Sequence, residues 1–228
     1  MINLEIVGYD FCPFIQPAIV TLKEKGAAFT MTYIEPHEKP DWVRQVSPEG
    51  MTPFLLGDGK VLFESAAINE FVNEAISGDL HPRDAFLKAQ NRMWISRSYD
   101  LLDYIYELKT TDSQNVFHAE KMKLRTKLRA LDEAIGENTF FNGADFSLID
   151  GAFAPVFRSI ALLDGQFAAG ILDALPNVAR WSMNILDRPS VQASVVESFD
   201  ARSAEKILRS HAIAARLHSS SAAASDVF

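Results

Sequence analysis

The pattern of apolar residues changes partway along this chain of 228 residues, and the change constrains the fold more than any other feature. Before the turn-forming segment at residues 77–82, stretches typical of strands alternate with stretches typical of helices, which indicates an α/β unit. After this segment only helical patterns follow. The sequence therefore predicts an α/β domain over residues 1–77, a linker over 78–84, an all-helical domain over 85–218 and a flexible tail over 219–228.

Periodicity and turn signals assign the individual elements. Gly57-Asp58-Gly59-Lys60 predicts a tight hairpin, because Asp-Gly supplies the positive φ angles that such a turn needs. Ser147 and Asp150 are spaced to form a capping box at the start of a helix. The expected strands span residues 4–7, 29–34, 54–56 and 61–63, and the expected helices span 18–25, 65–75, 86–108, 119–135, 148–163, 178–186 and 201–217.

Composition narrows the range of functions. The formal net charge of −8 argues against a nucleic-acid partner, because binding to phosphates requires a basic face. The N-terminus lacks the basic and apolar regions of a secretory signal, and no apolar run reaches the roughly 18 residues of a membrane-spanning helix. A single cysteine excludes a disulfide framework within the chain. Together these features favour a reducing cytoplasm and no association with a membrane.

Cys12 is that single cysteine, and it lies where a helix is expected to begin, directly before Pro13. Proline is tolerated in a first helical turn, where the N–H groups have no partner within the helix. The same N–H groups and the helix dipole favour a thiolate, so we expect a nucleophilic Cys12 with a pKa below the ordinary value of about 8.5. The alternative is a small buried hydrophobic residue. Ile15 occupies the position of the second thiol in a Cys-x-x-Cys pair, so a disulfide route needs an external thiol.

The sequence predicts no metal site. No glycine-rich phosphate loop is present either. The histidines are scattered, and none has a ligand-like spacing with Cys12 or with another histidine: they are His37, His81, His118, His211 and His218.

Three short motifs follow one another in the first half of the chain. Cys12-Pro13-Phe14 opens the first expected helix, Met51-Thr52-Pro53-Phe54 precedes the third expected strand, and Glu64-Ser65 follows the fourth. With Lys39-Pro40-Asp41-Trp42 in the intervening loop, these motifs resemble the cytosolic glutathione transferase superfamily, most closely the omega class and its bacterial relatives. The resemblance implies the glutathione transferase fold, in which a thioredoxin-like α/β domain precedes an all-α domain. The helical half resembles the same family at residues 146–150, 176–181 and 188–191.

By this resemblance Cys12 is the catalytic nucleophile, and Thr52 presents its backbone N–H and C=O to the cysteinyl part of glutathione, as an added strand does. The place of Pro53 in a tight loop before a strand predicts a cis Thr52–Pro53 peptide. A cis bond before proline costs only about 0.5–1 kcal/mol, so a tight turn can enforce it. The simpler interpretation is that Pro53 only interrupts the loop.

The remaining contacts with glutathione are also assigned by resemblance. Glu64 pairs with the γ-glutamyl ammonium group, while Ser65 and the start of its helix bind the carboxylate. Lys39 contacts the glycyl end, and Phe14 lines the site. From the residues alone, Ser65 is explained as a helix cap, Lys39 as a solvated lysine and Phe14 as a core residue.

The implied activity is that of an omega-like glutathione transferase of the thioltransferase or dehydroascorbate reductase type. Cys12 takes up glutathione from a mixed disulfide, and a second glutathione resolves the Cys12–glutathione disulfide. The alternatives are glutathione-dependent cleavage of an ether or thioether, and a non-enzymatic binding protein with the same fold.

The expected partners are glutathione as co-substrate, a small electrophilic or disulfide substrate, and a second copy of the chain in a homodimer. By resemblance, Phe157 and Arg158 belong to the pocket of the second substrate. The sequence supports the dimer only with apolar residues that are available for a contact, namely Phe63, Met93, Trp94 and Tyr99.

Overall fold

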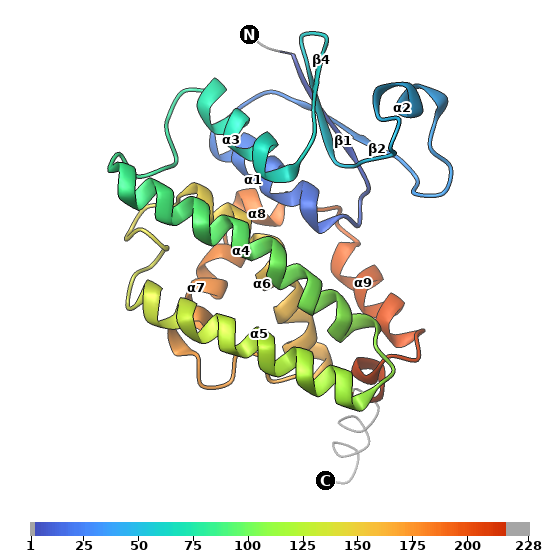
Figure 1. Ribbon diagram of the computed structural model, residues 1–228, viewed down its shortest axis with the longest axis vertical. Coiled ribbons are helices and arrows are strands. Elements are labelled where there is room, and N and C mark those ends of the chain that lie inside the picture. Colours follow the sequence, from blue (N-terminus) through green and yellow to red (C-terminus); the bar gives the residue numbers. More distant parts are fainter. Residues whose placement is uncertain (1–2, 218–228) are drawn as a thin grey trace.

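The computed structural model describes residues 3–217, and within this range the first part of the chain forms a four-stranded mixed sheet (Figure 1). β1 pairs in parallel with β2 and antiparallel with β3, and β4 extends the sheet as a hairpin with β3. The tail expected at residues 219–228 lies outside the described residues. The strands are β1 (Leu4–Gly8), β2 (Thr30–Tyr33), β3 (Phe54–Gly57) and β4 (Lys60–Leu62).

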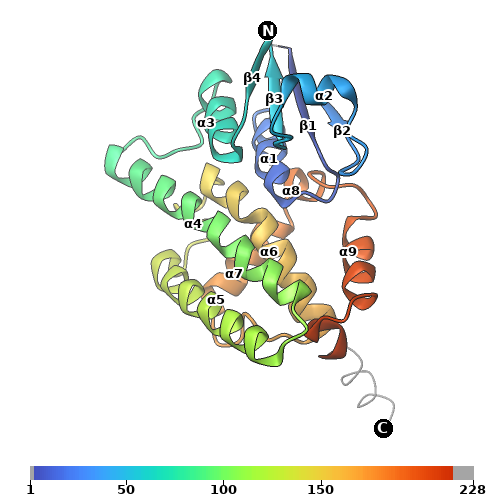
Figure 2. The same ribbon diagram turned by 45° about the vertical axis from the view of Figure 1, so that its right-hand side comes forward.

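Helices pack on both faces of the sheet, because the pleat sends successive side chains to opposite sides. Leu4 and Ile6 of β1 pack against α1 (Gln16–Glu24) and α3 (Ser65–Ala75). Val7 points to the other face and packs against Val43 of α2 (Asp41–Val46). Figure 2 shows α2 in front of the strands and α1 behind them. α2 was not predicted from the sequence, since this helix of six residues buries only Val43 and so has no apolar periodicity.

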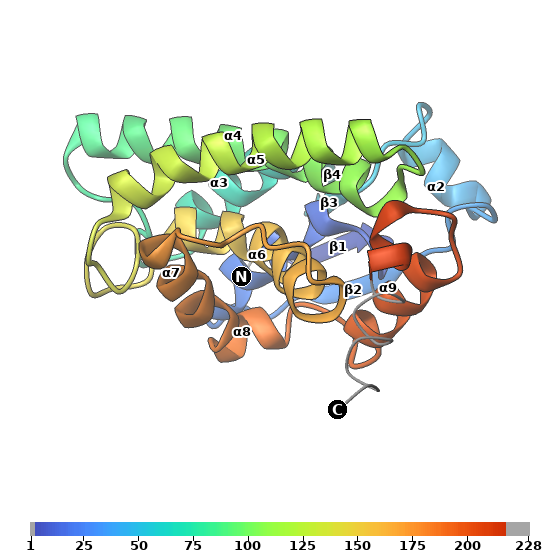
Figure 3. The ribbon, with the colours of Figure 1, turned by 90° about the horizontal axis from the view of Figure 1, so that it is seen from below.

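The rest of the described chain is helical, as expected. α6 lies in the middle, with α4 and α5 on one side and α7 and α8 on the other (Figure 3). Most residues of α6 are buried, which agrees with this central position. The helices are α4 (Ala85–Thr110), α5 (Gln114–Ile135), α6 (Leu148–Phe167), α7 (Pro176–Leu186), α8 (Pro189–Gln192) and α9 (Phe199–Leu208).

The helix expected over residues 201–217 is wrong in its second half. α9 ends at Leu208, residues 209–212 form a turn, and residues 213–217 are helical again. Ser210 explains the break, because its hydroxyl donates to the Ile207 carbonyl and accepts from the N–H of Ala212 at 3.2 Å. The division into domains at residues 78–84 stays a prediction; residues 76–84 contain no helix or strand.

A buried carboxylate holds the start of α6. The capping box expected at Ser147 and Asp150 is confirmed, with Asp150 Oδ2 accepting from the Ser147 N–H at 2.7 Å and from the Ser147 hydroxyl at 2.7 Å. Oδ1 accepts from Trp181 Nε1 at 2.6 Å and from the Phe141 N–H at 2.9 Å. Asp150 has no exposed surface, and its burial raises its pKa, although these donors act in the opposite direction. This one side chain therefore joins α6, α7 and the segment before α6.

The two parts of the chain pack closely through α1. Gly151 of α6 allows this approach, because a Cβ at that position would lie 3.2 Å from Val20 Cγ1 of α1. At the end of α1, Glu24 accepts two hydrogen bonds from Arg188, at 2.8 and 2.7 Å, and one from the Ser190 hydroxyl. Across residues 3–217, no helix has the length and apolar character needed to span a membrane.

Candidate active site

The sheet topology brings four loops to one end of the sheet. β1 and β2 are parallel, so the loops that follow Gly8 and Tyr33 leave the sheet on the same side. β3 is antiparallel to β1, so the segment before Phe54 enters on that side. β4 returns there as well, which places Glu64 next to these loops. The motifs containing Cys12, the lysine loop, Thr52-Pro53 and Glu64-Ser65 are thus gathered by strand direction alone.

The end of β1, the start of the first helix and the turn before β3 meet at Gly8. A Cβ on Gly8 would lie 2.6 Å from Ile15 Cδ1 and 3.4 Å from Pro53 Cβ, so only glycine fits without displacing Ile15. The predicted cis peptide between Thr52 and Pro53 is confirmed. Pro53 is buried and Thr52 is partly exposed beside it. Thr52 is therefore a partly exposed residue close to the start of the loop that carries Cys12.

Cys12 occupies the N-cap of the short 3-10 helix η1 (Pro13–Ile15), which leads directly into α1. Its own N–H donates to the Tyr9 carbonyl at 3.1 Å, which fixes the loop. The pKa expected below the ordinary value is wrong for this structure. Burial raises the pKa of the Cys12 thiol, although hydrogen bonds from the backbone N–H groups of Phe14 and Ile15 act to lower it.

Lys39 is tied to the loop that precedes Thr52. Its Nζ donates to the Gly50 carbonyl at 2.9 Å and lies 5.8 Å from the centre of the Tyr9 ring. Gly50 has a φ of +71°, which favours glycine. Lys39 is partly buried by these contacts, so it is not the fully solvated lysine of the simpler interpretation.

Glu64 has an unusual backbone at the start of α3. It is the N-cap, with φ +66° and ψ 112°, and no side chain caps the helix. Ser65 is the first helical residue, so the simpler interpretation of Ser65 as the N-cap is wrong. The Glu64 side chain is exposed at the end of the sheet that carries Cys12. A non-glycine residue held at positive φ is a form of strain that recurs at ligand-binding sites.

Phe14 connects the Cys12 loop to the helical part by stacking on Tyr99 of α4, with 6.0 Å between ring centres. The Tyr99 hydroxyl is buried and has no hydrogen-bond partner among the described residues. Burial raises the pKa of Tyr99, and the nearby carboxylates of Glu64 and Glu70 raise it further. Phe14 itself packs against both cores, so its packing role is established, while its contact with glutathione stays a prediction.

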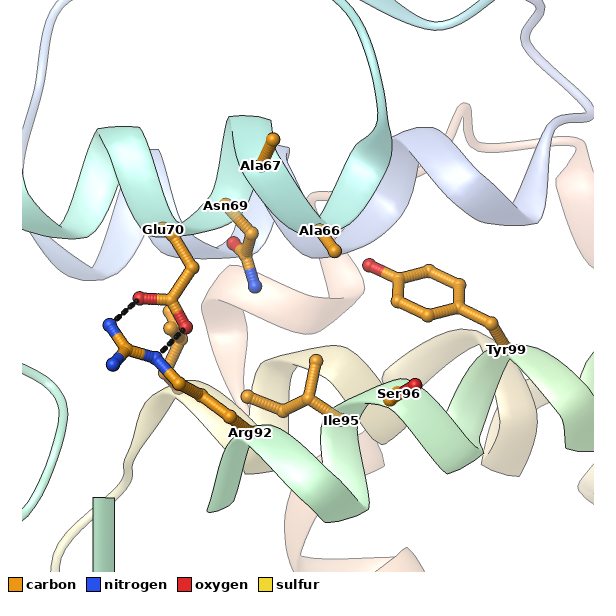
Figure 4. A pocket seen from close by; sticks show the side chains of 9 residues that line it. Ala66, Ala67, Asn69, Glu70, Arg92, Ile95, Ser96 and Tyr99 are labelled. Carbon is orange, nitrogen blue, oxygen red and sulfur yellow. Dashed lines mark hydrogen bonds and ion pairs between the residues drawn. The ribbon is translucent and has the colours of Figure 1, made fainter. Parts of the chain in front are cut away.

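Tyr99 also lines a cavity of about 300 Å³ between α3 and α4. In Figure 4 its hydroxyl points towards Ala66, and Asn69 points into the same space. Asn69 Nδ2 likewise has no partner among the described residues. At the far end of the cavity Arg92 donates to both carboxylate oxygens of Glu70, at 3.0 and 2.9 Å.

A second cavity of about 320 Å³ lies beside Cys12. Its walls are mainly apolar, and two of the residues that line it, Phe11 and Pro13, flank the cysteine. This cavity was not predicted from the sequence, because its other walls come from helices far apart in the sequence. They include Leu102, Ile105 and Lys109 of α4, Ser159 of α6, and Phe199, Lys206 and Ile207 of α9.

α9 is attached to the loop that carries Cys12. Phe199 stacks on Phe11 with 5.2 Å between ring centres. Arg202 lies 4.2 Å from the centre of the same ring and forms an ion pair with Asp10 at 2.6 Å. α9 therefore closes one side of the cavity beside Cys12.

Neither of the two residues expected in the substrate pocket lines the cavity beside Cys12. Phe157 is a core residue with no exposed surface, packed against Trp181 at 4.9 Å, so its assignment to the pocket is corrected. Arg158 donates to the Val191 carbonyl at 2.7 Å and lies 3.7 Å from the Asp200 carboxylate. Arg158 lines a different cavity, of about 370 Å³, and not the one beside Cys12. Its guanidinium is held mainly by these contacts.

The described residues contain no group of three or more histidine, cysteine or acidic side chains arranged to hold a metal ion. The four motifs gathered at the end of the sheet contribute backbone groups, hydroxyls, the Glu64 carboxylate and the Lys39 ammonium group. Such a set is suited to a zwitterionic organic ligand with a peptide backbone. The residues on either side of the thiol, Phe11 and Pro13, line an apolar cavity.

Comparison with known proteins establishes the family. The model for the N-terminal domain of glutathione S-transferases matches residues 11–75, and the model for their C-terminal domain matches residues 114–182. Together the two matches cover more than half of the chain, which therefore belongs to the glutathione S-transferase family.

Individual relatives agree with this assignment. The chain is 27% identical to glutathione S-transferase omega-1 of Sus scrofa over 203 residues, which covers 87% of this chain and 83% of that protein. It is 28% identical to glutathione S-transferase DHAR1 of Oryza sativa subsp. japonica over 184 residues, or 78% of this chain and 81% of that protein. Glutathione transferase Omega 3C from Trametes versicolor has the same fold, with a TM-score of 0.76 and 24% identity over 86% of this chain and 90% of that chain.

The raised pKa of Cys12 leads to a prediction for the free protein. Because only the thiolate is nucleophilic, alkylation of Cys12 by iodoacetamide should be slow at pH 7 and should still be accelerating above pH 9. Rates measured from pH 6 to 10 by mass spectrometry report on Cys12 alone, since the chain has no other cysteine. Free glutathione alkylated in the same buffers is the control. A rate that levels off below pH 8 would contradict the prediction.

Proposed function

We propose that this chain is a glutathione-dependent thiol transferase or reductase of the omega-like or dehydroascorbate reductase type, with Cys12 as its nucleophile. One observation carries the proposal: the single thiol of the chain lies at a helix start, and its two neighbours, Phe11 and Pro13, line an apolar cavity. The names of its relatives, omega-1 and DHAR1, support the same class of activity. A reducing cytoplasm is the proposed setting, because both the thiol and free glutathione are stable there.

In this proposal glutathione binds across the end of the sheet. The exposed Glu64 carboxylate pairs with the γ-glutamyl ammonium, and Ser65 with the first turn of α3 binds the carboxylate. The backbone of Thr52 pairs with the cysteinyl part as an added strand does. Lys39 is assigned to the glycyl carboxylate. Phe14 holds the loop that carries Cys12 in place through its stacking on Tyr99.

The reaction proceeds by two thiol–disulfide exchanges. The Cys12 thiolate attacks the glutathione sulfur of a mixed disulfide, forms a Cys12–glutathione disulfide and releases the second thiol. A further glutathione thiolate then attacks that disulfide, which releases oxidised glutathione and regenerates Cys12. The backbone N–H groups of Phe14 and Ile15 favour the thiolate each time it forms.

The apolar cavity beside Cys12 supports a second candidate, glutathione-dependent cleavage of an aryl ether or thioether. Phe11 and Phe199 offer aromatic walls to such a substrate. A non-enzymatic binding role is the third candidate, and it would give glutathione binding with no turnover of a mixed disulfide or an aryl thioether.

Replacing Cys12 with serine should separate these chemistries. We expect wild type to reduce a glutathione mixed disulfide, and Cys12→Ser to lose that activity by at least about 1,000-fold, as removal of a covalent nucleophile does. Conjugation of glutathione to a chloro-nitroaromatic acceptor should be weak in wild type and should not fall in Cys12→Ser, since a hydroxyl then occupies the position. Efficient conjugation by wild type with no reduction would show that the single-thiol mechanism is wrong.

Glu64 and Ser65 should determine the affinity for glutathione. Loss of one charge-assisted contact costs roughly 1.5–3 kcal/mol, so Glu64→Gln and Ser65→Ala are expected to raise the Kd by about 10-fold or more. Calorimetric titration with glutathione measures this, and the exposed Glu137→Gln is the matched control. Unchanged affinity in both variants would place the site elsewhere.

The homodimer is also a proposal. Of the apolar residues expected at its contact, three are packed or partly buried within their own chain. Trp94 and Tyr99 pack against the core of their own chain, and Phe63 is partly buried. Met93 of α4 and Val61 of β4 remain 40% exposed and offer apolar surface for a two-fold contact. Sedimentation at micromolar concentration should give twice the mass of one chain, and a persistent monomer would refute the dimer.

A further inference from the structure

A partly buried ammonium group lines the cavity beside Cys12. Lys109 is in the last turn of α4, and its Nζ donates to the Ser159 hydroxyl at 2.8 Å. Within residues 3–217 no carboxylate lies close enough to form an ion pair with it. Burial lowers the pKa of Lys109 to about 8, the more distant Asp200 acts in the opposite direction, and Lys206 lowers it further.

Other partly buried cations of this chain are better satisfied. The Lys25 ammonium donates to three carbonyls, those of Asn73, Ile76 and Gly78. Lys109 has three N–H donors as well, but one hydroxyl is its only hydrogen-bond partner in the described part of the chain. Removing an ammonium group from water costs free energy unless its remaining N–H donors find an acceptor or a counter-charge.

The residues that line the cavity indicate what kind of ligand would pair with the Lys109 ammonium group. Phe11, Leu102, Ile105, Phe199 and Ile207 provide apolar contacts for a small ring. The charged residues that line the cavity are Lys109 and Lys206, and no aspartate or glutamate lines it. The cavity is thus apolar in its body and positive at the end where α4 finishes. Its volume of about 320 Å³ suits one ring with a short substituent.

We propose that the cavity selects substrates with an anionic group on a small apolar or aromatic body, and that Lys109 binds the anion. This proposal rests on the proposed function, since it names the class of the second substrate. An arene thiol that carries a carboxylate and is joined to glutathione by a disulfide has the required form. Its carboxylate pairs with Lys109, and its ring lies against Phe11 and Phe199 near Cys12. The exchange at Cys12 breaks the glutathione–arene disulfide, forms the Cys12–glutathione disulfide and releases the arene thiolate.

A matched pair of substrates tests the selectivity. The glutathione mixed disulfides of 4-mercaptobenzoate and 4-mercaptobenzamide differ in charge and little in shape. We expect wild type to prefer the benzoate in kcat/KM, and Lys109→Met, which keeps the length of the side chain, to reduce this preference by about 10-fold or more. The quantity compared between variants is the ratio of kcat/KM for the benzoate to kcat/KM for the benzamide. A difference in intrinsic reactivity between the two disulfides affects every variant equally and so cancels. Lys109→Arg and the exposed Lys60→Met should keep the wild-type ratio.

Binding without reaction gives a second readout. Calorimetric titration with 4-(methylthio)benzoate and 4-(methylthio)benzamide should show the same preference and its loss in Lys109→Met. The preference should also fall as the pH rises above about 8, because the neutral amine no longer attracts the anion. Lys206 and Tyr106 are the other titratable residues that line the cavity, and Lys206→Met should change the preference less than Lys109→Met, since Lys206 is exposed.

The outcomes are distinguishable. A Lys109→Met protein that keeps the wild-type ratio in both assays would overturn the proposal and leave Lys109 a structural residue. If wild type turns over neither disulfide, the proposed function fails, while a benzoate preference in binding that depends on Lys109 still supports the anion site. Lys109→Gln answers the same question if the methionine variant does not fold.

Discussion

The buried carboxylate of Asp150 is the interaction on which the arrangement of the helical part depends. It accepts hydrogen bonds from Ser147, Phe141 and the Trp181 ring, and so fixes the first turn of α6 against α7. α6 in turn supports α1 on one side and α4 on another, and these helices carry the Cys12 loop and the wall of the adjacent cavity. A group fully removed from water is stable here only because each oxygen has two donors.

Sequence reasoning predicted the parts of the site that depend on local order along the chain. The hairpin at Asp58-Gly59 and the cis peptide before Pro53 follow from neighbouring residues. The convergence of the motif loops was implied by the family resemblance, and the strand directions explain it. The cavity beside Cys12 was not predictable in this way. Lys109 and Phe199 come from separate helices, and nothing in the local pattern of either helix shows that they face the same space. Phe157 was misplaced for the same reason, since a phenylalanine on a helix gives no sign of which neighbour covers it.

At Cys12 the effect of packing on the thiol pKa is larger than the effect of the helix start. Its place at a helix start was predicted correctly, and the two backbone N–H groups act on it in the expected direction. The surrounding apolar residues, including Ile15 and Ile6, remove water from the sulfur, and that loss is the larger effect. Burial of this kind is a tertiary property. In the ligand-free protein this burial raises the pKa of the thiol and lowers its thiolate fraction, which slows its reaction with oxidants.

α1 has a consequence that reaches beyond the site. Every residue from Gln16 to Leu22 is buried, because Ile19 and Leu22 face the sheet while Val20 belongs to the core of the helical part. One helix thus supplies hydrophobic surface to two cores at once. Each half of the chain therefore covers part of the core of the other through α1, although the two halves differ in architecture.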